Sequence, residues 1–228
     1  MSFDFTSLTE GMISHADAVR EMRARILEGK TSYADVVRDV RPVDLRMKTE
    51  QFFDAVQSII AEATDAAVML VPVDHEAQSA PETAMEIIAA REGRWVPGEE
   101  DASEGVKLGW TLSQVVAHVT AILEDGMACA AMLARGVRLE GRLLYEVPWK
   151  SMTKASHVQA RVRESRRICL ALLDAWPDQP HLETTVIRIP EIGPLNAIGI
   201  GMSGIFHGPM HLDQLREIIR QAKEAANS

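Results

Sequence analysis

Apolar residues recur at steps of three and four positions along most of the chain, which is the period of an amphipathic α-helix. Four long segments carry this pattern: about 45–70, 111–134, 154–176, and from 203 or 208 to 226. Pro72 and Pro177 follow the first and third segments, and proline does not continue a helix. Four long amphipathic helices with long connections predict an all-α fold, a four-helix bundle.

The residues before the first long segment have a helical pattern of their own. A helix is expected over about Ser7–Glu28, with Gly29 as its stop, and a short helix over Tyr33–Val40. We therefore expect an N-terminal helical extension over residues 1–44 and a bundle domain over residues 45–228.

Two connections between the long segments stand out. Residues 73–109 hold prolines, glycines and many acidic residues, so we expect a long loop between the first two bundle helices, with a brief helix at Pro81–Arg91. A loop of this length in a compact domain is often a lid or binding segment. Residues 184–200 are expected to form a crossing connection with at most a short strand.

The charge and composition disfavour some classes of function. The formal net charge is −9, whereas a protein that neutralises phosphates needs an excess of Lys and Arg, so we expect no nucleic-acid partner. The basic run at 161–167 lies in a helical pattern and is expected to be a solvated face. Cys129 and Cys169 do not make a disulfide framework and are expected to be buried small apolar residues.

The sequence also indicates the cellular compartment in which the protein is expected. It begins Met-Ser-Phe-Asp, without the basic start and apolar run of a signal peptide. We find no stretch that approaches the roughly 18 apolar residues of a membrane span. A cytoplasmic protein with no membrane partner is therefore expected.

Three of the seven histidines point toward the expected core or its edge. His207 and His211 are four residues apart, so on a helix they stand one turn apart on one face. At about 100° per residue, His211 lies roughly 45° and His207 roughly 85° from the centre of the apolar stripe of the last helix. His118 lies roughly 100° from the stripe centre of the second bundle helix, at the border of the core.

Buried imidazoles need partners for their nitrogen atoms, because burying an unpartnered polar group costs free energy. A core histidine bonded to a carbonyl is the ordinary alternative for each one alone. One divalent metal between His118, His207 and His211 satisfies a nitrogen on all three, and bundle interiors often hold such sites. Gly208 and Pro209 lie between the paired histidines, so the helix can begin at Gly208 and leave His207 on its lead-in.

Two motifs resemble those of the DinB-like superfamily. The segment Gly109–His118, GWTLSQVVAH, resembles the second-helix motif of that superfamily. The pattern His207-x3-His211-x2-Gln214-Leu215 resembles its last-helix motif. The order of the expected elements also agrees, so the resemblance covers residues 45–228.

The resemblance implies a four-helix bundle with one divalent metal, zinc or nickel, held by His118, His207 and His211. Some members resemble transferases or isomerases that use mycothiol, bacillithiol or glutathione, so the resemblance implies a low-molecular-weight thiol cosubstrate. Several members are dimers, which makes a homodimer an expectation here too. The N-terminal extension, the 73–109 insertion and the Gly-Pro pair depart from the pattern, so the substrate is not carried over.

Other residues near the expected site are candidates for supporting roles. Gln114 lies one turn before the first of the three histidines and Gln214 three residues after the last, so both are candidates for orienting an imidazole. Asp125 is expected to be a surface acid rather than a proton-transfer group. Trp110 is expected to anchor the start of its helix. No catalytic residue is identified.

Three functions remain open at this point. The leading hypothesis is a metal-dependent S-transferase that uses a thiol and a small-molecule substrate. The second is a metal-dependent hydrolase with a metal-bound water as nucleophile. Three neutral ligands leave zinc an open fourth position, which suits either reaction. The third is a non-enzymatic ligand-binding or stress protein.

Overall fold

The computed structural model describes residues 15–72, 110–139, 141–144, 146–188, 190 and 192–228. The expected helix before residue 15 and the expected loop at 73–109, with its brief helix at Pro81–Arg91, lie outside the described residues. The elements in chain order are α1 (His15–Leu27), α2 (Tyr33–Val37), α3 (Pro42–Ile60), α4 (Asp65–Val68), α7 (Leu112–Ala134), the 3₁₀ turn η4 (Trp149–Ser151), α8 (Ala155–Asp174), α9 (Ala197–His207), the 3₁₀ turn η5 (Gly208–His211) and α10 (Leu212–Ala226).

In the part of the chain that the structure describes, the regular secondary structure is helical. That part contains no β-strand, and its only strand-like pairing is an isolated bridge between Val186 and Leu195 in the connection before α9. The prediction of an all-α fold is confirmed, and the described residues of the connection at 184–200 hold no more than this bridge before the helix begins.

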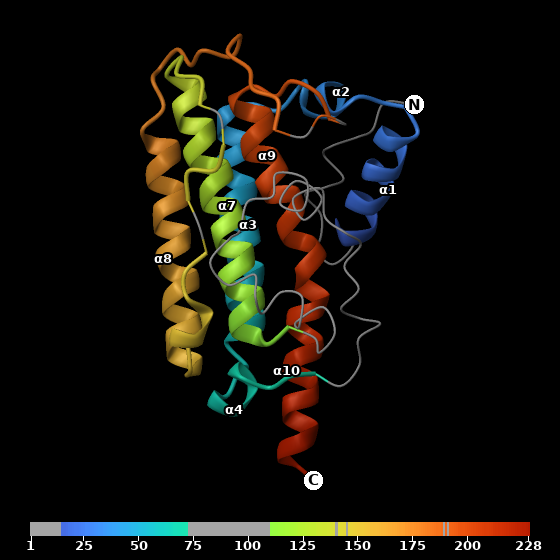
Figure 1. Cartoon of the computed structure of the whole chain (residues 1–228), viewed down its shortest axis with the longest axis vertical. Helices are drawn as coiled ribbons and strands as arrows, with labels where there is room; N and C mark the ends of the chain where they lie inside the picture. Colours follow the sequence, from blue (N-terminus) through green and yellow to red (C-terminus); the bar gives the residue numbers. More distant parts are fainter. Residues whose placement is uncertain (1–14, 73–109, 140, 145, 189, 191) are drawn as a thin grey trace.

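Four long rods lie along the long axis of the molecule: α3, α7, α8, and the continuous run of α9, η5 and α10 (Figure 1). α7 packs against α8 and α9, and α3 packs against α8, α9 and α10. Large apolar side chains fill the space between the rods, and burying each one stabilises the fold by about 1.5–3 kcal/mol. Those with less than 2% exposure include Phe52, Phe53, Leu123, Met127, Met202 and Leu215.

α7 is the most enclosed of the rods. It begins with a capping box, in which Thr111 Oγ1 accepts the N–H of Gln114 (3.3 Å) and Gln114 Oε1 accepts the N–H of Thr111 (2.8 Å). Contrary to the sequence expectation, α7 is long and apolar enough to span a membrane. However, 94% of its most apolar 18-residue window is buried inside the protein, so its apolar length is accounted for by packing.

The first predicted long helix is two helices in the structure. α3 begins earlier than expected, with Pro42 in its first turn, where a missing N–H breaks no helical bond. It ends at Ile60, and α4 follows a short turn. Thr64 takes the extended conformation of a capping residue, and Asp65 accepts the N–H of Ala155 at the start of α8 (2.9 Å). This bond joins the start of α4 to the start of α8.

The last predicted helix also begins earlier, at Ala197, where the side chain of Asn196 accepts the N–H of Gly199 (3.0 Å). α9 is rich in glycine, which has low helix propensity, and its sequence therefore does not read as helical. Packing against α7 stabilises the helix despite this low propensity. The backbones of α7 and α9 approach so closely that a Cβ added at Gly126 lies 3.6 Å from the Cα of Gly204.

The N-terminal extension packs on the same body as the rods. Gly29 ends α1 with a φ of 68°, as predicted for a helix stop. α1 lies against η5 (Figure 1). In α2, the hydroxyl of Tyr33 donates to the carbonyl of Gly199 (3.1 Å), and its ring meets Phe206 edge-on. The extension therefore contributes to the same apolar core.

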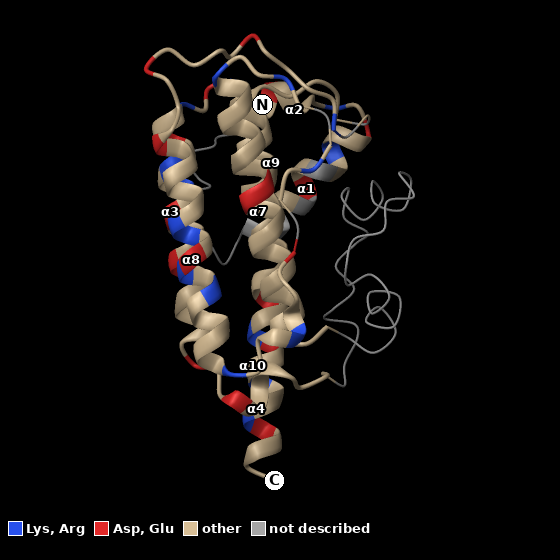
Figure 2. Ribbon diagram, turned by 60° about the vertical axis from the view of Figure 1, so that its left-hand side comes forward, with Lys and Arg blue, Asp and Glu red and all other residues tan. Residues whose placement is uncertain are grey.

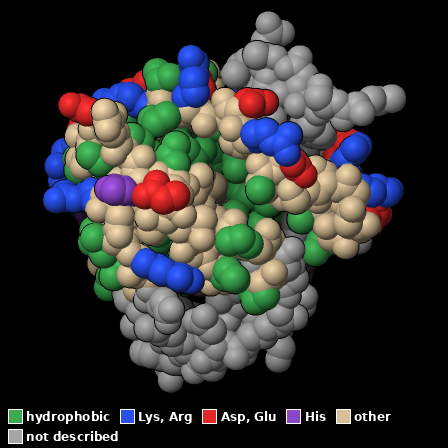
Figure 3. Space-filling view, turned by 90° about the horizontal axis from the view of Figure 1, so that it is seen from above, with side chains coloured by type: hydrophobic (Ala, Val, Ile, Leu, Met, Phe, Trp, Pro, Cys, Tyr) green, Lys and Arg blue, Asp and Glu red, His purple; other side chains and the backbone are tan. Residues whose placement is uncertain are grey.

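Acidic and basic residues are interspersed along the outer faces of the rods (Figure 2), and apolar side chains lie between charged ones at the end that carries α2 (Figure 3). Within the basic run, Arg167 pairs with Glu164 in solvent as expected. Arg161 departs from the expectation, since its side chain is only 10% exposed. Its Nη2 lies 2.8 Å from Oε1 of Glu124 on α7, close but not aligned as a hydrogen bond. This ion pair joins α7 to α8.

Candidate metal centre

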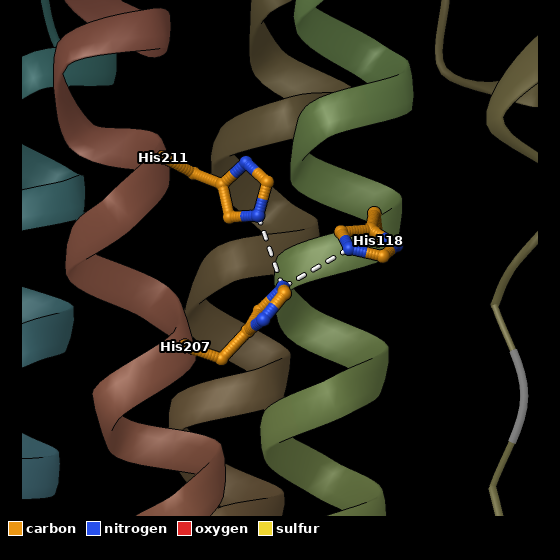
Figure 4. Close-up of side chains that lie close together, drawn as sticks. All are labelled: His118, His207 and His211. Atoms are coloured by element: carbon orange, nitrogen blue, oxygen red, sulfur yellow. Dashed lines mark hydrogen bonds between the residues drawn. The ribbon is translucent and has the colours of Figure 1, made fainter. Parts of the chain in front are cut away.

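Three histidine side chains meet where α7 faces the junction of α9 and η5 (Figure 4). His118 comes from α7, His207 is the last residue of α9, and His211 is the last residue of η5. The Nε2 atom of His207 lies 3.0 Å from the Nε2 atom of each of the other two. The three candidate ligand atoms all lie within 4.8 Å of one another, and the residues are 8%, 8% and 2% exposed.

The chain brings His207 and His211 together through a local change of helix type. His207 lies on a regular α-helical turn, so the expectation that it lies on a lead-in is wrong. The helix tightens to a 3₁₀ turn over Gly208–His211, with Pro209 near its start, and α10 continues from Leu212. Pro209 lacks the N–H that would continue the α-helical bonding of α9, and the chain changes to a 3₁₀ turn at this point.

Gly208 lets this junction pack closely against α3. A Cβ at this position would lie 2.4 Å from a ring carbon of Phe52, which is nearly fully buried. Real Cβ atoms essentially never approach so closely. The glycine is therefore a steric requirement of the junction, and Phe52 fixes the position of the backbone between the two histidines.

Hydrogen bonds on the outer side of two rings fix which nitrogen carries the proton. The Nδ1 atom of His118 lies 2.9 Å from Oε1 of Glu146, and Nδ1 of His211 lies 2.8 Å from Oε1 of Gln214. A carboxylate and an amide oxygen only accept, so each Nδ1 donates. In their neutral forms, His118 and His211 therefore have an unprotonated Nε2.

The inner nitrogens then form an arrangement that favours a cation. The Nε2 lone pairs of His118 and His211 both point toward Nε2 of His207. Neutral His207 has one N–H at most on that atom, which can satisfy only one of the two lone pairs. A metal ion accepts a lone pair from each ring. The donor set, three neutral imidazole nitrogens, fits zinc and nickel alike.

Burial and neighbouring groups shift the pKa of two residues at the cluster. Burial and the neighbouring His118 lower the pKa of His211 to about 3, although the bond to Gln214 acts in the other direction. Burial alone would raise the pKa of Glu146, but the hydrogen bond from His118 and the charge of Arg142 bring this pKa below its usual range. Glu146 is therefore an anion at physiological pH.

Trp110 packs directly on the histidine rings. Its ring is parallel to that of His211, with centroids 6.4 Å apart, and meets the ring of His118 edge-on at 4.8 Å. It precedes the capping residue Thr111, so it lies at the entry of α7 as predicted. The sequence did not indicate that this residue also covers the site.

The candidates for orienting the imidazoles fall in different places. Gln214 contacts His211, whereas the side-chain oxygen of Gln114 is used in the capping box of α7. Glu146, which sequence reasoning missed, contacts His118. It lies in an irregular connection between α7 and η4, where no periodic pattern indicates a position in space.

Asp125 is not the surface acid that the sequence predicted. It is 1% exposed, because it lies on the side of α7 that the following connection covers. Its carboxylate accepts the N–H groups of Leu143 (2.6 Å) and Leu144 (3.0 Å) and pairs with Arg188 (2.6 Å). Its role is to hold that connection onto the helix.

The remaining histidines and the cysteines lie away from this cluster or outside the described side chains. His157 is exposed, and His181 pairs with Glu183 at the surface. Cys129 and Cys169 are fully buried as predicted, and burial raises the pKa of both thiols. Neither cysteine therefore has the thiolate character that a nucleophile needs.

No protein-family model matches the chain, and no match is found among curated proteins or among solved structures. The fold and the site therefore define the class by themselves. This is an all-α protein with a buried three-histidine group that can hold a metal ion.

Proposed function

We propose that this chain is a DinB-like four-helix bundle that binds one divalent metal, zinc or nickel, through Nε2 of His118, His207 and His211. The observation that carries the proposal is the convergence of three inward-facing imidazole nitrogens, two of them with their outer nitrogens already bonded. The packing of the four rods supports the bundle assignment.

The distances support zinc without large movement. Zinc bound to imidazole nitrogens at about 2.0–2.1 Å in a tetrahedral site separates two of those nitrogens by roughly 3.4 Å. The two shorter separations in the cluster are 3.0 Å and all three nitrogens lie within 4.8 Å of one another, so the two close pairs need to widen slightly and the third pair to approach.

The proposed activity is that of a thiol-using S-transferase acting on a small-molecule substrate. A divalent ion held by three neutral ligands keeps its full charge and an open position, where it lowers the pKa of a bound thiol or water. Glu146 and Gln214 keep the proton on the outer nitrogens, so that the inner lone pairs stay available. Trp110 packs over two of the rings and limits their freedom to turn.

A thiol titration tests the activity. Protein stripped with a chelator and reloaded with zinc or nickel is titrated with glutathione, mycothiol and bacillithiol by calorimetry, and then assayed for S-transfer to electrophilic small molecules. We expect saturable binding of one thiol in the loaded protein and none in the stripped protein.

Other outcomes of the same titration decide between the alternatives. Turnover of ester, amide or phosphate substrates by the metal-loaded protein without any thiol would replace the transferase with a metal-dependent hydrolase. Loaded protein without thiol binding or turnover would leave a metal-containing ligand-binding or stress protein. A chain that takes up no metal would overturn the proposal as a whole.

We also propose that the protein works in the cytoplasm without a nucleic-acid partner. The formal net charge of −9 supports the second part, because binding to phosphates requires a basic surface.

A further inference from the structure

The connection that carries Glu146 is fastened to α7 by a buried anchor. Asp125 accepts hydrogen bonds from the backbone of Leu143 and Leu144, and Arg188 bridges the same carboxylate to the carbonyl of Gly141. Asp125 is 1% and the Arg188 side chain 13% exposed, so this anchor is almost free of water. Buried, charge-assisted bonds of this kind are the stronger ones in proteins.

The anchor and the metal cluster lie on one side of α7. His118 and Asp125 are seven residues apart, which is two helical turns and about 10.5 Å along the axis. The chain from Leu143 or Leu144 to Glu146 advances two or three residues, which span at most about 7–11 Å. This reach is comparable with the two helical turns between Asp125 and His118, and the side chain of Glu146 spans the rest of the distance to the imidazole.

We propose that Glu146 is the positioning residue of the metal centre and that the Asp125–Arg188 anchor holds it in place. By accepting the Nδ1–H of His118, Glu146 fixes both the rotation of that ring and the nitrogen that carries the proton. The side chains of the pair are only 10% and 22% exposed, so water competes poorly for the bond. This inference rests on the proposed metal site. Carboxylates that orient metal-binding histidines typically contribute 10–100-fold to metal affinity.

Four proteins test this role: the wild type, Glu146→Ala, Glu146→Gln and Glu183→Ala. The last is a matched control, since Glu183 makes the same carboxylate–imidazole contact with His181 at 2.7 Å, but at the surface. Zinc affinity is measured by competition with a chromogenic chelator, and the coordination is read from the absorption spectrum after Co²⁺ loading. Thermal unfolding shows that each metal-free variant is folded.

We expect Glu146→Ala to bind zinc about 10–100-fold more weakly and to change the Co²⁺ spectrum. Glu146→Gln keeps an accepting oxygen and is expected to regain most of the lost affinity. Glu183→Ala is expected to match the wild type in both measurements.

The possible failures are distinguishable. A wild type that binds no zinc overturns the proposed metal site and this inference with it. A wild type that binds zinc, with Glu146→Ala unchanged in affinity and spectrum, overturns the inference alone. The inference is equally overturned if Glu146→Gln loses as much affinity as Glu146→Ala, because the accepting oxygen would then not be what matters.

Discussion

At the scale of single residues, three imidazoles that are each less than a tenth exposed cost free energy unless their nitrogens have partners. Glu146 and Gln214 satisfy two outer nitrogens, and the inner ones face each other. With a pKa of about 3, His211 is neutral at physiological pH. Metal binding needs unprotonated imidazole, so His211 is in the state that a cation requires.

The lowered pKa of His211 predicts how the stability of the metal-free protein depends on pH. In the unfolded chain the imidazole has a pKa of about 6.5. Below that pH the imidazole is protonated in the unfolded state but stays unprotonated in the folded state. The stabilisation is fully present above about pH 6.5 and is lost as the pH falls toward the folded value of about 3. Between these values the loss from this residue is about 1.4 kcal/mol per pH unit.

Urea unfolding of the metal-free protein at pH 7, 6 and 5 measures this effect. His211→Leu removes the titrating group, so the variant is expected to lose less stability over the same range. Equal pH dependence in the two proteins would contradict the assigned burial of His211.

Among the described glycines, Gly208 is the one where an added Cβ would make the closest contact. A methyl group there meets the ring of Phe52, and overpacking of this kind costs about 1–3 kcal/mol. We expect Gly208→Ala to lower the unfolding free energy by that amount. In the double variant Gly208→Ala/Phe52→Leu, Phe52→Leu is expected to lower the unfolding free energy less than it does in the wild type, because the smaller side chain makes room for the added methyl group. Strict additivity in this cycle would show that the clash is not the cause.

At the scale of elements, Gln114 can be tested for two roles: capping α7 and orienting a histidine. The sequence suggests that it orients a histidine, whereas the structure uses its side chain at the start of α7. Gln114→Ala is therefore expected to lower the unfolding free energy by about 0.5–2 kcal/mol and to leave zinc affinity within about twofold of the wild type. A tenfold loss of affinity in a folded variant would restore the orienting role.

The elements differ in how far sequence alone predicts them. α7 is predicted to within a residue or two, because a periodic apolar stripe and its Thr111 cap both mark it. The first part of α9, before residue 203, is missed because its glycines lower helix propensity and contact with α7 compensates. The three histidines are found from their angles to the apolar stripes. Glu146 is not, because its place depends on the anchor at Asp125 and not on any local pattern.

At the scale of the whole molecule, the site depends on how α7 sits against the α9–η5–α10 rod. One ligand comes from the first and two from the second, so a metal ion would join the two rods directly. The N-terminal extension adds to this arrangement, since α1 lies against η5 and α2 against α9. A ligand that binds only the folded state stabilises it. We therefore expect the metal to stabilise the fold in addition to its role in the chemistry.

The metal content of the purified protein tests the central claim most directly. Elemental analysis is expected to find about one zinc or nickel per chain in the wild type. His118→Ala is expected to lose most of it, and His157→Ala, which removes an exposed imidazole, to keep it. A wild type without stoichiometric metal, or a folded His118→Ala variant that retains it, would contradict the account.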